Sequence, residues 1–198
     1  MQGIHPMLWR RFLVCAESTL ADLHCILQVG FGWTDFHLHR FRIRKKSDTV
    51  PRIGMMKGHD ARTVRLADLK FRMNERFLYE YDFGDAWLHE VRIEQRLPLD
   101  PKQTYSVCID GQHASPPDDC GGTQMYLQMR VGLTYRAWFG SHGREHDFND
   151  EDDRGVEGVS ADQPVDPDDF SRRKGNARLR QYASVDREGC FQTERRPL

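Results

Sequence analysis

The side chains with the clearest chemical capacity lie in two short segments, and the first is Trp33-Thr34-Asp35-Phe36-His37-Leu38-His39. Successive side chains of a strand point to opposite faces, so His37 and His39 would share one face if this segment is extended. Imidazoles in that arrangement are typical metal ligands. They are also typical of a hydrogen-bonded core, and no third ligand is fixed by the spacing.

The second segment runs from Tyr79 to His89 and carries Asp82 and Asp85 in a tight turn before the histidine. If the two segments form neighbouring strands, three imidazoles could converge with one aspartate, which would suit zinc, or iron with open positions. The metal candidates are then His37, His39 and His89, and the candidate catalytic residues are Asp82, Asp85 and His89. The alternative is a turn whose aspartates bond backbone amides and whose glycine supplies a positive φ.

A third group is the loop that contains Cys108 and Cys120, with His113 between them. These side chains could hold a metal, but the short spacing of structural zinc cysteines is missing, so a rigid loop covering the sheet is the alternative. The chain also lacks the phosphate-loop, dinucleotide, zincin and esterase-elbow motifs. A nucleotide hydrolase, a dehydrogenase, a zincin protease and an ordinary esterase are therefore disfavoured.

These groups must be positioned by regular elements that the pattern predicts. Strands are expected at residues 7–14, 36–43, 77–81 and 87–94. Apolar and polar side chains alternate along 36–43, and Trp87, His89, Val91 and Ile93 share one face of 87–94. A helix is expected after Ser18 or Thr19, since Leu20, Leu23, Ile26 and Leu27 recur at helical spacing before Gly30 and Gly32. Residues 45–73 form a long connection, and Asp110-Gly111 and residues 116–122 form loops. Further helices are expected at residues 124–138 and within 165–179.

This order of elements predicts an α+β fold, with a mixed, mainly antiparallel sheet, a helix packed across one face and short C-terminal helices. A β-grasp-like arrangement is one form that fits. Residues 1–140 are expected to form the α+β domain and residues 141–163 a flexible acidic insertion. Residues 164–180 would be a docking segment of the same domain, and residues 181–198 a tail.

The composition of the 198 residues is that of a globular chain, with 38% hydrophobic and 30% charged residues. No apolar run is long enough to cross a bilayer, and five scattered cysteines fit reduced thiols, so we expect a cytoplasmic protein without a membrane partner. Residues 40–76 hold twelve Lys and Arg against four Asp and Glu, whereas residues 145–169 hold one Arg against eleven acidic residues. The basic segment could contact phosphates or could simply be a solvated face.

Taken together, these motifs resemble the plasmid pRiA4b ORF-3-like family. The matching segments are Gly3-Ile4-His5-Pro6, Leu8-Trp9-Arg10-Arg11, residues 19–24, Gly32-Trp33-Thr34-Asp35, His37-Leu38-His39, Tyr81-Asp82-Phe83-Gly84-Asp85 with Trp87 and His89, residues 108–122, and Asp166-Pro167-Asp168-Asp169-Phe170. The resemblance implies an α+β fold and an association with plasmids and insertion elements, and it implies no established reaction. The chain departs from the family pattern before Gly3, at Ser115 and over residues 131–163.

The preferred hypothesis is an accessory or binding module of a mobile element, whose partner is a nucleic acid or another mobile-element protein. Its binding surface would comprise Trp33, Asp35, His37, His39, Tyr81, Asp82, Asp85, Trp87 and His89. Phosphate contacts would come from Arg40, Arg42, Arg44, Lys45 and Lys46. The competing hypothesis is a metal-dependent enzyme, such as a hydrolase, that uses the His/Asp cluster with zinc or iron. A third is a purely structural role for the histidines and aromatic residues.

Overall fold

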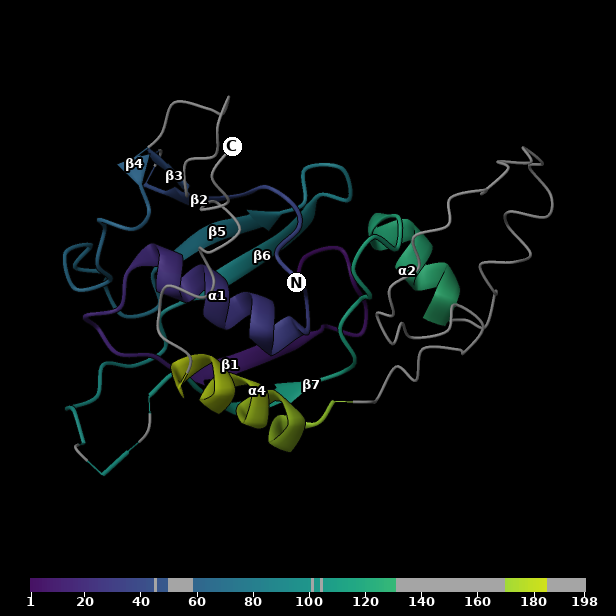
Figure 1. The fold of residues 1–198 in the computed structure, drawn as a ribbon. Coiled ribbons are helices and arrows are strands. Elements are labelled where there is room, and N and C mark those ends of the chain that lie inside the picture. The colour runs from purple at the N-terminus through teal and green to yellow at the C-terminus, as the bar shows by residue number, and fades with distance from the viewer. Residues whose placement is uncertain (45, 50–58, 101, 104, 131–169, 185–198) are drawn as a thin grey trace, which may run out of the picture.

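The computed structural model describes residues 1–44, 46–49, 59–100, 102–103, 105–130 and 170–184. Within these ranges the chain is an α+β protein with three helices and seven strands. Figure 1 shows a long helix lying across a twisted sheet, with a second helix beside a separate pair of strands. None of the described helices is both long and apolar enough to span a membrane.

The central helix is α1, Leu20–Phe31, and its ends are those that the sequence predicts. The Thr19 hydroxyl accepts a hydrogen bond from the backbone N–H of Asp22, whose carboxylate accepts one from the backbone N–H of Thr19, so the two residues form a capping box. Gly32 ends the helix in the left-handed region, at φ 78°. The leucine stripe of α1 is buried in the main core.

The main sheet has five strands in the order β4-β3-β2-β5-β6. Their bounds are β2 His39–Ile43, β3 Lys46–Thr49, β4 His59–Asp60, β5 Arg76–Tyr81 and β6 Trp87–Arg92. The pairs β2–β3, β2–β5 and β5–β6 are antiparallel and β3–β4 is parallel, which confirms the mixed, mainly antiparallel sheet. The registers His39↔Tyr81 and Tyr81↔Trp87 bring the two predicted segments side by side.

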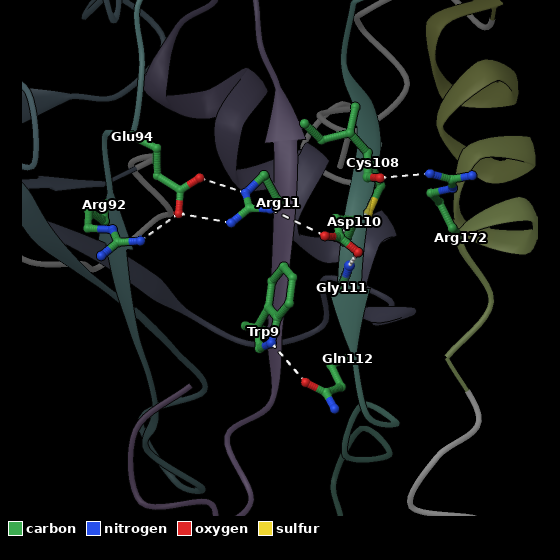
Figure 2. Close-up of polar contacts among 10 residues, drawn as sticks. Trp9, Arg11, Arg92, Glu94, Cys108, Asp110, Gly111, Gln112 and Arg172 are labelled. Atoms are coloured by element: carbon green, nitrogen blue, oxygen red, sulfur yellow. Dashed lines mark hydrogen bonds and ion pairs between the residues drawn. The ribbon is translucent and has the colours of Figure 1, made fainter.

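Two strands form a separate sheet, β1 Trp9–Leu13 paired antiparallel with β7 Val107–Gln112. A chain of ion pairs links this sheet to the end of β6 (Figure 2): Arg11 lies 2.6 Å from Glu94 and 3.2 Å from Asp110. Glu94 in turn lies 2.6 Å from Arg92. The charged side chains between β1, β7 and the end of β6 therefore form a network of ion pairs.

Three predicted boundaries need correction. Asp110-Gly111 belongs to β7 and not to a loop. A Cβ at Gly111 would lie 2.7 Å from the ring of Phe170. Glycine therefore leaves room for this ring, and a larger residue at 111 would clash with it. The predicted connection at residues 45–73 contains β3 and β4, and the strand predicted from residue 36 begins at His39.

The remaining helices are α2, Gly122–Arg130, and α4, Arg172–Ser184. The prediction of a helix at 124–138 continues outside the described residues, and the predicted acidic insertion at 141–163 lies outside them. Of the tail predicted at residues 181–198, residues 181–184 belong to α4 and the rest lies outside the described residues. Asn176 of α4 accepts a hydrogen bond from the backbone N–H of Cys108 and donates one to its carbonyl, 2.8 Å each. The amide thus occupies the outer edge of β7 in the way a neighbouring strand would.

Candidate functional site

The aromatic residues of the predicted binding surface lie inside the core. Trp33, Tyr81 and Trp87 are buried, and Trp33 stacks on Tyr81 with ring centroids 4.8 Å apart. The Trp33 indole donates a hydrogen bond to the carbonyl of Pro116, at 2.9 Å. His39 and His89 are buried too. The part of the predicted surface that reaches solvent is therefore narrower than expected and is centred on residues 34–37 and 83–86.

The loop before α2 closes over this region through two aspartates. Asp118 accepts hydrogen bonds from the backbone N–H and the hydroxyl of Thr34, at 3.0 and 2.6 Å, and from the hydroxyl of Tyr81 at 3.3 Å. Asp85 accepts one from the backbone N–H of Gly121 at 3.0 Å. Asp85 therefore joins the β5–β6 turn to this loop.

His37 lies between two other carboxylates. Its Nδ1 is 3.8 Å from Oδ1 of Asp82, and its Nε2 is 2.7 Å from Oδ1 of Asp119. One ligand atom from each of the three residues lies within 4.8 Å of the others. Solvent exposure increases across the cluster: Asp82 is buried, His37 is half-buried, and the side chain of Asp119 is 67% exposed.

Both carboxylates of this cluster sit on left-handed backbone, with φ 54° at Asp82 and 55° at Asp119. The predicted positive φ at Gly84 is wrong, because Asp82 and Ala86 take that conformation in the turn. Aspartate adopts it more readily than most residues, at a cost of roughly 1 kcal/mol. Oδ1 of Asp82 also accepts a hydrogen bond from the backbone N–H of Gly84, which fixes the carboxylate beside His37.

His39 lies in a different cluster. Its ring is stacked on that of His24, from α1, with centroids 3.5 Å apart and planes at 11°. His24 Nε2 is hydrogen-bonded with Oδ1 of Asp35 and its Nδ1 with the hydroxyl of Tyr79, both at 2.7 Å. Gln28 donates to the same hydroxyl and accepts from the backbone N–H of Asp35.

His89 occupies a third environment. Its ring lies edge-on to Phe31 and Trp33, at centroid distances of 4.7 and 5.4 Å. Among the described residues, neither ring nitrogen has a hydrogen-bond partner. Burial lowers the pKa of His89 to about 3, so the imidazole is neutral at physiological pH. The structure therefore does not bring His37, His39 and His89 together around one point.

The arginines predicted to contact phosphate are engaged in ion pairs across the sheet. Arg40 Nε lies 2.7 Å from Glu80, and Arg42 is bonded to the same carboxylate. Arg44 is paired with Glu75, and this hydrogen bond lowers the pKa of Glu75 to about 2. Lys46 begins β3, and Lys45 lies outside the described residues.

Sequence reasoning missed four residues of these clusters: His24, Gln28, Asp118 and Asp119. His24 and Gln28 face inward from a helix that was assigned to packing alone. His24 and Gln28 follow Leu20 at intervals of four residues, so they share its buried face of the helix. This spacing is a signal that could have identified them. Asp118 and Asp119 lie in a loop whose path over the sheet depends on tertiary contacts.

Comparison with known proteins places this architecture in a family. The model for plasmid pRiA4b ORF-3-like proteins matches residues 1–174, and the chain belongs to that family. The uncharacterized protein y4hQ of Sinorhizobium fredii (strain NBRC 101917 / NGR234) is 34% identical over 135 residues, which cover 67% of this chain and 69% of that protein.

A solved structure is similar to this chain in sequence and fold. The crystal structure of MM3350, a protein of unknown function from Methanosarcina mazei Go1, has 32% sequence identity to this chain and a TM-score of 0.60. The match covers 74% of this chain and 79% of that one. Neither relative carries an assigned reaction in its name.

Proposed function

We propose that this protein binds a divalent metal at the cluster of His37, Asp82 and Asp119, and that the bound metal is its working centre. The observation that carries the proposal is the position of Asp119 Oδ1, 2.7 Å from Nε2 of His37. Although this nitrogen is buried, it makes no aligned hydrogen bond within the described part of the chain. Because these two atoms lie close together without forming a hydrogen bond, both could be ligands of one metal ion.

The donor set indicates which metals fit. One imidazole and two carboxylates suit zinc, manganese or iron(II), and three protein ligands leave coordination positions for water or a substrate. The exposure of Asp119 gives solvent access to those positions. A metal in such a site lowers the pKa of bound water toward neutrality, which is the chemistry of a hydrolase.

Calorimetric titration of the full chain with zinc and manganese tests the metal site, and His37→Gln and Asp119→Asn remove a ligand each with little change of volume. Asp110→Asn is a matched control, since Asp110 is exposed and lies on β7, paired with Arg11. We expect the two cluster variants to weaken binding by at least about 10-fold, because loss of even an outer-shell partner has that effect. Binding of wild type and variants with one affinity would refute the site.

A second candidate is an accessory module of a plasmid or mobile element that binds nucleic acid in the cytoplasm. The observation that favours it is that Arg40 and Arg42 share one carboxylate, that of Glu80, so this pair of strands keeps excess positive charge. The guanidinium of Arg40 also lies 4.9 Å from the ring centroid of Phe83. Arginines on a sheet face can contact phosphate groups while they remain paired.

Nucleic-acid binding would be tested by titrating labelled duplex DNA and RNA at several salt concentrations. This candidate predicts an affinity that falls steeply with salt, because each phosphate contact releases a counterion. The double variant Arg40→Gln/Arg42→Gln should lose about two phosphate contacts, and the slope of log affinity against log salt concentration should fall by about two. Binding that ignores salt, or that survives unchanged in the double variant, would exclude these arginines as the phosphate-contacting residues.

A further inference from the structure

We infer that a closed ring of hydrogen bonds among four residues positions two of the metal ligands of the site proposed above. The inference rests on that proposed function, because it assigns to the ring the placement of His37 and Asp119. The members of the ring are Gln28, Tyr79, His24 and Asp35. Two of them lie one turn apart on α1, one lies on β5, and the fourth lies in the segment between α1 and β2.

Each bond of the ring has one direction. The side-chain oxygen of Gln28 accepts from the backbone N–H of Asp35 at 3.2 Å, so its nitrogen faces Tyr79 and donates to that hydroxyl at 2.9 Å. Among the described residues, the hydroxyl proton has one acceptor, His24 Nδ1 at 2.7 Å. Nδ1 therefore carries no proton, and Nε2–H of His24 donates to Oδ1 of Asp35 at 2.7 Å.

The interior of the protein encloses most of this ring. Gln28, Tyr79 and His24 are all less than 4% exposed. Burial raises the pKa of Tyr79 well above its ordinary value, so the hydroxyl keeps the proton that it donates. A buried network in which every polar group is paired is rigid, because a change of arrangement would leave a group unpaired.

Asp35 connects the ring to the metal ligands. It is held twice from α1, through its backbone N–H and through its carboxylate, and its φ is 60°, in the left-handed region. His37 lies two residues further along the chain. On the other side of Asp35, Thr34 donates its backbone N–H and its hydroxyl to Asp118, which is the neighbour of Asp119. Loss of the ring should therefore displace His37 and Asp119 relative to each other.

The experiment is a calorimetric titration of the full chain with zinc chloride, and it compares a variant that breaks the ring with one that keeps it. Tyr79→Phe removes the hydroxyl that joins Gln28 to His24. It should weaken zinc binding by about 10-fold, the smaller end of the effect of an outer-shell partner. Asp35→Asn keeps an oxygen that accepts from His24, and asparagine adopts the left-handed conformation. Its zinc affinity should equal that of the wild type.

A control variant separates positioning from stability. Ile26 lies on α1 but packs in a different hydrophobic cluster, so Ile26→Val lowers stability without removing a bond of the ring. Its zinc affinity should not change. Gln28→Met breaks two bonds of the ring and replaces Tyr79→Phe if that variant does not fold. Circular dichroism of each variant establishes that it is folded.

Nuclear magnetic resonance of the metal-free protein gives a second measurement, which does not depend on the metal. The nitrogen signals of the imidazoles show which ring nitrogen carries the proton, and His24 should carry it on Nε2. In Tyr79→Phe, the ring signals of His37 should shift and the amide of Asp35 should exchange faster with solvent. Neither should change in Ile26→Val.

These outcomes separate the ring from the metal site. A proton on Nδ1 of His24 would overturn the ring, whether or not the protein binds zinc. Zinc affinities of Tyr79→Phe and wild type that are equal would overturn the positioning role and leave the metal site standing. A folded wild type that binds no zinc would refute the metal site, and unchanged His37 signals in Tyr79→Phe would then refute the positioning of His37 as well.

Discussion

His37 Nδ1 lies 3.8 Å from Oδ1 of Asp82, whereas Asp85, in the same turn, is bonded to the backbone of Gly121. Two aspartates that the sequence leaves equivalent therefore have different partners. In the proposed site, Asp82 is one of the two carboxylate ligands beside His37. Asp85 holds the loop that carries Asp119, the other carboxylate of the proposed site.

The two aspartates should accordingly respond differently to substitution. Asp82→Asn should weaken metal binding by at least about 10-fold, because the variant removes a charged ligand. Asp85→Asn should weaken it less and should lower stability by about 1 kcal/mol, through the weakened hydrogen bond to Gly121. Calorimetric titration and urea denaturation measure the two effects. Equal effects on metal binding would contradict the assignment of Asp82 as a ligand.

His89 should make the protein sensitive to acid. Its folded-state pKa of about 3 is below the unfolded value of 6.5, so the unfolded chain binds the extra proton between these values. The contribution of neutral His89 to the free energy of unfolding is complete above about pH 6.5. It is lost as the pH falls toward 3, at about 1.4 kcal/mol per pH unit. Urea denaturation from pH 7 to 4 measures this slope.

The variant that isolates this effect is His89→Phe, which fits among Phe31 and Trp33 and does not titrate. Its stability should fall less steeply with acid than that of the wild type. If both proteins show the same slope over that pH range, His89 is not the group responsible.

Glu80 should stabilise the face of the sheet that carries Arg40 and Arg42. Burial opposes its ionisation, but the hydrogen bonds from the two arginines prevail and lower its pKa. The resulting stability is present above the unfolded pKa of about 4.3 and is lost as the pH falls below it. Glu80→Gln should cost roughly 1–3 kcal/mol at pH 7, measured by urea denaturation, and much less near pH 3. A cost independent of pH would point to packing instead.

Asn176 should hold α4 against β7. Asn176→Ala removes both hydrogen bonds to the backbone of Cys108 and should cost about 1–3 kcal/mol. Hydrogen exchange at the Cys108 amide should accelerate, while exchange in α1 should change little. Asn176→Asp keeps the acceptor and should protect that amide better than the alanine variant does. Unchanged exchange in Asn176→Ala would contradict the docking role.

The elements nearest to the site could be predicted because their signals are local. The capping residue Thr19 and the terminal glycine Gly32 define α1, and the turn at residues 82–85 separates the two segments that form β5 and β6. The strand at Asp110-Gly111 could not be predicted, since its pairing with β1 is a long-range contact that overrides turn propensity.

The residues of the proposed site could be found only in part from the sequence. The sequence indicates His37 and Asp82, whereas Asp119 joins them only through the path of the loop. The spacing of His37 and His39 suggests one shared face, but β2 begins at His39 and His37 lies in the bend before it. The alternation on which that prediction depends therefore does not extend to His37, and the two imidazoles enter different clusters.

The most direct test of the central claim is the metal content of untagged protein, purified without chelator and measured by elemental analysis beside a His37→Ala/Asp119→Ala double variant. The wild type should carry near-stoichiometric zinc, manganese or iron at the His37 cluster, and the folded double variant should lose that metal. Equal metal content in the two folded proteins, or none in the wild type after dialysis against each ion, would contradict the claim.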